Sequence, residues 1–206
     1  SFVFNHGGKS GKLDYYLGAA AKGTGGHRKQ AYCNLRDYWG RIGYGISEDW
    51  DATLVLSSYD NTADDPGVAG TATPPRGRFN NENVTANLTI SNRNDRFDGF
   101  MRLYMDDGSM NWQQWDATSS SGFDTNTDYL NRGLRAQQNI ALTSATQLTV
   151  GLDYDAYGGK AVELRSTAAA TKTMPAKYFY STALYTSLSY SFTLRPERIS
   201  GRGEAR

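Results

Sequence analysis

Residues 83–107 read NVTANLTISNRNDRFDGFMRLYMDD, and two alternating segments meet there at a polar turn. In the first segment apolar residues such as Val84 and Leu88 occupy every second position, with threonine, asparagine and serine between them. In the second segment Met101 and Leu103 alternate with charged residues. Side chains repeat with a period of two only in a strand. The stretch therefore predicts a β-hairpin with one apolar and one polar face, turning at residues 92–95.

The same unit recurs along the rest of the chain of 206 residues. Alternating segments predict strands at residues 1–5, 12–22, 35–46, 50–59, 84–91, 97–106, 129–142, 147–157 and 178–194. The Gly-rich residues 6–11 predict a short turn. The expected fold class is all-β, an antiparallel meander of about nine strands.

The predicted connections alternate between short and long. The long ones are expected at residues 23–34, 60–83, 107–128 and 158–177. The apolar positions carry no charge through the central part of each strand, and aromatic residues lie near strand ends. Transmembrane β-barrels combine short periplasmic turns, long outer loops, an apolar outward band and aromatic girdles. The pattern favours part of such a barrel over a soluble β-sandwich, whose inward faces are also apolar.

Composition excludes several other classes. The formal net charge is +1 and the pI is about 7.7, which gives no electrostatic reason to expect a nucleic-acid partner. No run of about 18 apolar residues is present to form a transmembrane helix. The mean hydropathy of −0.62 remains compatible with a barrel, since lipid-facing and lumen-facing residues alternate there.

No residue pattern points to covalent chemistry. The chain contains no GxSxG, HExxH, Walker or GxGxxG context. The two histidines, His6 and His27, lie in different segments, and Cys33 is the only cysteine. We therefore predict that the protein is not an enzyme and has neither a cofactor nor a metal site.

Ligand contacts are expected in the long loops, because loops on a rigid scaffold usually carry binding. Asp64 and Asp65 are candidates within the sequence ADDPG, although such a sequence also forms a simple turn. Trp112 and Trp115, with Phe123, give the next long loop an aromatic character. These rings could contact a ligand or could pack the loop against the barrel rim.

A second set of charged residues occupies the polar positions of the predicted strands. In a wide barrel these side chains would face water or a passing ligand, and they could equally pair across neighbouring strands. The set comprises Asp14, Arg41, Asp98, Arg102, Arg135, Asp153 and Asp155.

Several segments resemble the barrel of TonB-dependent outer-membrane receptors, and they follow one another in the same order as in that family. They are HGGKSGKLDYYLGA (residues 6–19), LRDYWGRIGYGISEDWDATL (35–54), NTADDPG (61–67), FDGFMRLYMDDG (97–108), YLNRGLRAQQNIAL (129–142) and QLTVGLDYDAYGGK (147–160). The resemblance covers about residues 1–194. It implies a plug domain inside a 22-stranded barrel that imports a scarce ligand such as a siderophore or cobalamin. No position here corresponds to the plug or to its TonB-contacting segment.

The expectation is thus a fragment of such a receptor in the bacterial outer membrane. Residues 1–194 would form a partial barrel, and residues 195–206 a disordered or truncated tail. The expected partners are outer-membrane lipid, a small-molecule ligand such as a metal chelate, and the TonB complex through the missing plug. Two alternatives are a small self-standing barrel acting as a passive pore or adhesin, and a soluble β-sandwich that binds carbohydrate.

Overall fold

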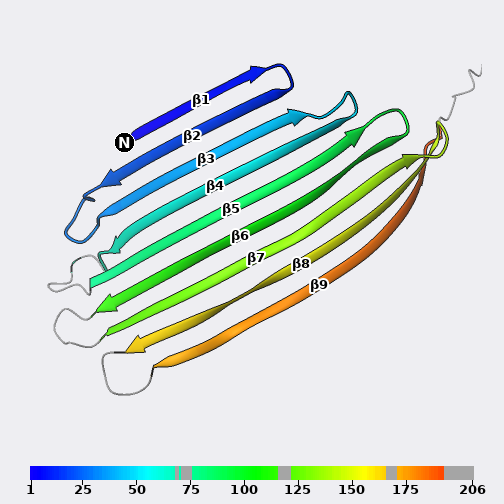
Figure 1. The fold of residues 1–206 in the computed structure, drawn as a ribbon. Coiled ribbons are helices and arrows are strands. Elements are labelled where there is room, and N and C mark those ends of the chain that lie inside the picture. The colour runs from blue at the N-terminus through cyan, green and yellow to red at the C-terminus, as the bar shows by residue number, and fades with distance from the viewer. Residues whose placement is uncertain (68–69, 71–75, 116–121, 166–170, 193–206) are drawn as a thin grey trace, which may run out of the picture.

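One antiparallel sheet forms the protein in the computed structural model, which describes residues 1–67, 70, 76–115, 122–165 and 171–192, excluding the side chain of Arg76. The strands are β1 (Phe2–Ser10), β2 (Leu13–Thr24), β3 (Cys33–Gly45), β4 (Trp50–Asp65), β5 (Arg76–Arg93), β6 (Phe97–Trp115), β7 (Gly122–Ala141), β8 (Thr146–Arg165) and β9 (Lys172–Tyr190). Each pairs with its neighbour in sequence, so the spatial order is β1 to β9 (Figure 1). The predicted nine-stranded antiparallel meander is confirmed.

The extent of the predicted loops was wrong. Residues 23–24, 33–34, 60–65, 76–83, 107–115, 122–128, 158–165 and 172–177 belong to strands, and residues 6–10 complete β1 instead of forming a turn. Most residues of these extensions are polar, and their few apolar residues do not form the regular alternation by which a strand is recognised. Backbone pairing with the neighbouring strand extends them nonetheless. The predicted tail, residues 195–206, lies outside the described residues.

Short turns at one end of the sheet are held by local side-chain caps. Ser47 Oγ accepts hydrogen bonds from the amides of Asp49 and Trp50, at 3.3 and 3.2 Å. Asn94 Oδ1 accepts from the amides of Arg96 and Phe97, at 3.0 and 2.8 Å. Serine and asparagine favour such turns because their side chains replace a backbone acceptor. The alternation of short and long connections is confirmed, and the long ones lie at the opposite end (Figure 1).

The register sorts side chains into two faces, because directly paired residues of antiparallel strands point to the same side. The face that carries Leu54, Leu88 and Leu103 is called the band face, and the opposite one the polar face. One cross-strand row of the band face runs through all nine strands: Gly8, Tyr15, Ile42, Leu54, Leu88, Leu103, Leu134, Tyr154 and Thr182. A second row comprises Ser10, Leu13, Tyr44, Ala52, Ile90, Met101, Ala136, Leu152 and Leu184.

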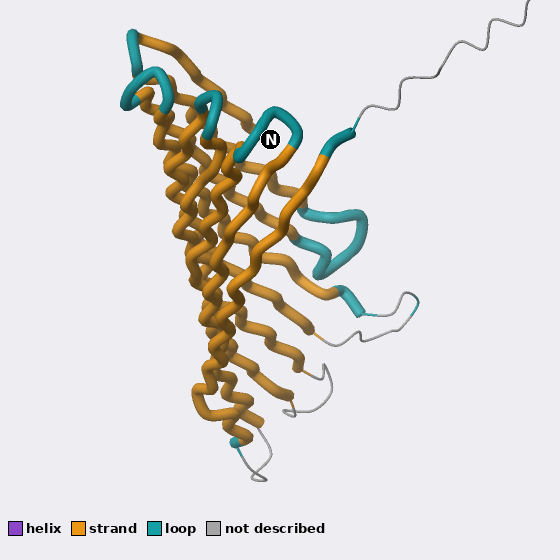
Figure 2. The backbone as a smooth tube through the Cα atoms, turned by 90° about the vertical axis from the view of Figure 1, so that its right-hand side faces the viewer, coloured by secondary structure: helices purple, strands orange, loops and turns teal. Residues whose placement is uncertain are grey.

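The sheet is a single curved layer (Figure 2). Ala20 is the one buried hydrophobic residue in the described part of the chain, and Leu184 and Leu188 are 81% and 68% exposed. The accessible surface area of the chain is 14,780 Å², which is larger than the value of about 9,500 Å² expected for a compact monomer of this mass. The described residues contain no helix capable of spanning a membrane. The sheet is open, with β1 and β9 at its edges.

Aromatic rings of the polar face lie over glycines on neighbouring strands. A Cβ at Gly133 would come within 2.4 Å of the Tyr104 hydroxyl, and one at Gly151 within 2.0 Å of the Tyr185 ring. Gly18 under Trp39 and Gly108 under Tyr129 repeat the arrangement. In each pair the glycine directly opposes the aromatic residue, so the missing side chain is replaced by the partner's ring.

Candidate functional site

The band face is uncharged across its centre. Neither of the two nine-strand rows contains Asp, Glu, Lys or Arg. Aromatic side chains flank this apolar band on the same face: Trp50, Phe97 and Tyr190 near the short turns, and Tyr38, Tyr178 and Tyr180 toward the other end. On β8 the uncharged positions run from Leu148 to Gly158, a rise of about 33 Å at about 3.3 Å per residue. A strand segment of this length tilted by about 45°, as in a transmembrane barrel, would span about 23 Å.

Charge begins abruptly beyond the band, toward the long connections. One cross-strand row there reads Arg36, Asp60, Glu82, Ser109, Asp128 and Lys160. Lys160 Nζ lies 3.0 Å from Asp128 Oδ2. Arg132, which directly opposes Ala156, pairs with Asp107, so on β6 and β7 the charge begins within the span that is uncharged on β8. The same face therefore changes from apolar to charged along these strands.

The polar face carries charge where the band face carries none. Its row between the two uncharged rows contains five charged residues among nine: Lys9, Asp14, Gly43, Thr53, Thr89, Arg102, Arg135, Asp153 and Ala183. Several members of the predicted charged set pair across strands, as one reading of the sequence expected. The pairs are Asp14 with Arg41, Arg93 with Asp98 at 3.5 Å, and Arg135 with Asp155 at 3.9 Å.

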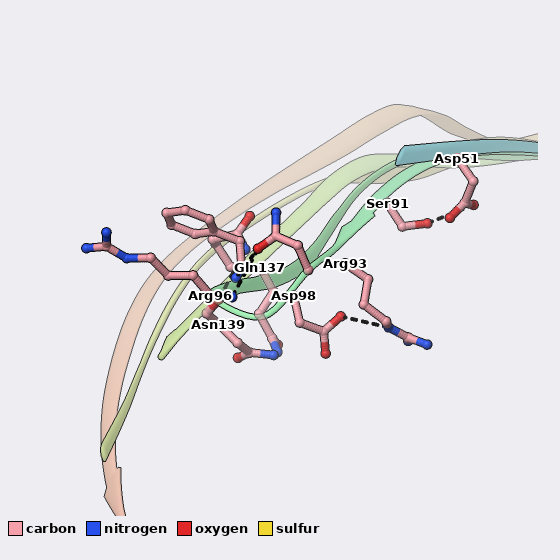
Figure 3. A network of polar contacts seen from close by, with 10 residues as sticks. Asp51, Ser91, Arg93, Arg96, Asp98, Gln137 and Asn139 are labelled. Atoms are coloured by element: carbon pink, nitrogen blue, oxygen red, sulfur yellow. Dashed lines mark hydrogen bonds and ion pairs between the residues drawn. The ribbon is translucent and has the colours of Figure 1, made fainter. Parts of the chain in front are cut away.

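Further polar contacts cover this face near the short turns. Ser91 Oγ donates to Asp51 Oδ2 at 3.0 Å, beside the Arg93–Asp98 pair (Figure 3). These four side chains lie on the concave side of the sheet in that view. Arg102 Nε donates to Thr89 Oγ1 at 3.1 Å. The concave side of the sheet is consequently hydrophilic.

A buried amide centre on the polar face was not anticipated from the sequence. Asn83 is 7% exposed, and its amide donates to Asp106 and, at 3.1 Å, to the Tyr129 hydroxyl. Thr85 Oγ1 donates to Asn83 Oδ1 at 3.1 Å. The asparagine was assigned to the boundary of a loop, so no sequence signal linked it to residues 23 and 46 positions away.

The structure separates the four predicted ligand residues into two pairs. Asp64 and Trp115 lie on the band face beyond its charged border, whereas Asp65 and Trp112 lie on the polar face. All four belong to β4 and β6 and not to loops. Asp65 Oδ1 accepts from the Gly67 amide at 2.9 Å, which matches the simple turn considered for ADDPG. Trp112 packs edge-on against Phe123, with 5.2 Å between ring centroids.

Asp64 and Trp115 line one cavity of about 430 Å³, called here the rim pocket. Its other lining residues are Gln30, Gly77, Arg78 and Gln113. The β2–β3 connection closes one side, since Tyr32 O accepts from the Asp64 amide at 2.7 Å and Arg28 donates to Gly67 O at 2.8 Å. Cross-strand pairing brings the remaining residues together from β4, β5 and β6.

The side chains that line the rim pocket carry no net charge, because Asp64 and Arg78 form an ion pair. Arg78 Nε donates to Asp64 Oδ1 at 2.8 Å, and this hydrogen bond, followed by the carboxylate charge, raises the pKa of Arg78. Gln30 Oε1 is buried and has no hydrogen-bond partner among the described residues. The pocket thus offers an indole surface, a carboxylate–guanidinium pair and two carboxamides.

The described residues contain no cluster of three His, Cys, Asp or Glu side chains able to hold a metal ion. No protein-family model matches this chain, and no curated protein sequence matches it.

Proposed function

We propose that this chain forms part of the wall of a bacterial outer-membrane β-barrel. The observation that carries the proposal is the contrast between adjacent rows of the sheet. Two uncharged rows on the band face enclose a row of the polar face that has five charged residues. Lipid against the band face and water against the polar face satisfy both sets of side chains.

The exposure of large apolar side chains on the band face supports the same arrangement. Each strand places large apolar residues on the band face, and Ile42, Leu88 and Leu103 are 43%, 38% and 44% exposed. Contiguous apolar patches of this extent are unusual on soluble monomers and mark surfaces that contact a partner or a membrane. The described residues form one sheet, so no second sheet covers the band as it would in a β-sandwich.

The direction of the edge strands favours a larger barrel over a closed nine-stranded one. β1 and β9 run the same way, because alternate strands of an antiparallel meander share a direction. Their direct pairing would create a parallel seam, whereas bacterial outer-membrane barrels close with antiparallel strands in even number. An odd number of further strands between β9 and β1 satisfies this requirement.

Within this proposal the barrel is of the TonB-dependent receptor type, importing a scarce small molecule through its lumen. The support is the ordered resemblance of the six segments quoted above. The polar face would line the lumen and contact the plug, through which the TonB complex acts. The long connections would then face outside the cell, where ligand first arrives.

Membrane orientation is tested with single-cysteine variants on a Cys33→Ser background. An environment-sensitive label at Leu88→Cys or Leu152→Cys reports on the band face, and a label at Thr89→Cys or Asp153→Cys on the polar face. In vesicles we expect brominated acyl chains to quench the first pair, and a water-soluble quencher the second. Equal quenching of adjacent positions by either agent would refute lipid contact along one face.

The receptor type needs a separate test, because any barrel wall would pass the quenching experiment. Sequencing the DNA on both sides of the coding region provides it. An encoded plug domain with a TonB-contacting segment upstream would support the receptor type. Flanking DNA that encodes neither would overturn the receptor type while leaving the barrel wall intact.

A further inference from the structure

We propose that the rim pocket is a saccharide-binding subsite that accommodates a single pyranose ring. The inference rests on the proposed function only for the side of the membrane that the pocket faces. The pocket itself is lined by Gln30, Asp64, Arg78, Gln113 and Trp115, together with Gly77.

The size of the pocket suits a small ligand. Ligand sites are typically about 300–1,000 Å³, and the rim pocket measures about 430 Å³. It lies beyond the charged border of the band face, on the β4, β5 and β6 extensions, so lipid chains would not fill it. A pyranose can enter from the aqueous side.

The indole of Trp115 provides the flat apolar surface that one face of a pyranose requires. Trp115 is 40% exposed and lines the pocket at the end of β6. Axial C–H groups of a sugar ring carry slight positive charge, and the face of an indole is negative. Stacking on Trp115 would therefore orient the ring and leave its hydroxyl groups at the edge.

The polar lining matches those hydroxyl groups, each of which both donates and accepts. Asp64 and Gln30 present acceptors. Arg78 and Gln113 present donors besides those they already give to Asp64 and, at 3.3 Å, to Asp124 Oδ2. Because Asp64 neutralises Arg78, the pocket has no net charge with which to select an ion. Gln30 Oε1, unpartnered within the described part of the chain, is an acceptor that a ligand hydroxyl would satisfy.

Binding is measured on the folded chain in detergent with a panel of glucose, galactose, mannose and N-acetylglucosamine and their short oligosaccharides. Tryptophan fluorescence and ligand-observed NMR supply two independent readouts. We expect saturable millimolar binding of at least one sugar, weakened at least tenfold by Trp115→Ala and about threefold to tenfold by Gln113→Ala. Gln114→Ala is the matched control, because Gln114 belongs to the opposite face.

If Trp115→Ala fails to fold, Gln113→Ala and Trp115→Phe carry the test. If no sugar of the panel binds, or if Gln114→Ala weakens binding as much as Gln113→Ala, the subsite is refuted. Vesicles containing lipopolysaccharide distinguish a membrane-attached glycan from a free one, since the former competes with the soluble sugar. Failure here leaves the lipid-quenching result unaffected.

Discussion

At the scale of single residues, the polar face is organised by side chains that would be costly to bury without partners. Asn83 is one of two buried polar residues in the described chain, the other being Asn92. Its amide contributes hydrogen bonds to Asp106 and Tyr129, on the next strand and the one beyond it. Such contacts between three strands fix their relative register as well as their pairing.

Replacing Asn83 with leucine should destabilise the folded chain by about 1–3 kcal/mol, because the half-buried Asp106 and Tyr129 lose a donor. Urea unfolding in lipid vesicles measures the change in free energy. Asn87→Leu is the control, since Asn87 shares the strand and face but makes no side-chain hydrogen bond within the described residues. Equal destabilisation by both substitutions would contradict the role given to Asn83.

At the scale of strands, the contrast between faces has a thermodynamic consequence. Leu88 and Asn87 are sequence neighbours on β5, pointing to the band face and the polar face respectively. A lysine facing lipid at mid-bilayer costs about 2–4 kcal/mol, whereas one facing water costs little. The two positions therefore distinguish membrane contact from a simple hydrophobic patch.

We expect Leu88→Lys to lower the free energy of unfolding in vesicles by about 2–4 kcal/mol and Asn87→Lys to lower it by much less. Folding is followed by circular dichroism and by the gel mobility of unheated samples. A larger penalty at position 87 than at position 88 would place the lipid on the other face and reverse the proposal.

Packing between neighbouring strands also depends on aromatic rings that lie over glycines. Gly133 opposes Tyr104, and Gly151 opposes Tyr185, with no room for a Cβ at either glycine. Gly133→Val should cost about 1–3 kcal/mol, because the new Cβ would meet both the Tyr104 hydroxyl at 2.4 Å and the Tyr154 carbonyl oxygen at 2.3 Å. Gly23→Ala is a tolerant reference, since its Cβ would meet no atom closer than 3.6 Å. Thermal unfolding midpoints of the two variants provide the comparison.

At the scale of the whole molecule, the open edges determine how the sheet behaves alone. β1 and β9 each pair on one side only, so every second amide of these strands has no partner in the sheet. We expect hydrogen exchange to be faster in β1 and β9 than in β5, β6 and β7 when the chain is monomeric in detergent. Protection of β9 equal to that of β6 would indicate that another strand occupies the edge.

Some of this architecture was predictable because side-chain direction alternates with every residue of a strand. The apolar and polar faces, the nine strands and the alternating connections follow from the sequence order of residues such as Leu54, Leu88 and Arg102. Pairing across strands was one of two readings of the charged residues on the polar face, and Arg135 and Asp155 follow it.

Other features depend on which strands become neighbours, and the sequence alone does not contain that distance information. The extent of β4 to β9 came from backbone pairing, since their polar ends have no periodic signal. Register placed Asp64 and Trp115, 51 residues further along the chain, on the same face and around one pocket. It set Asp65 and Trp112 on the opposite face. Amino-acid order thus determined the two faces, and only tertiary pairing decided where their residues assemble into a pocket.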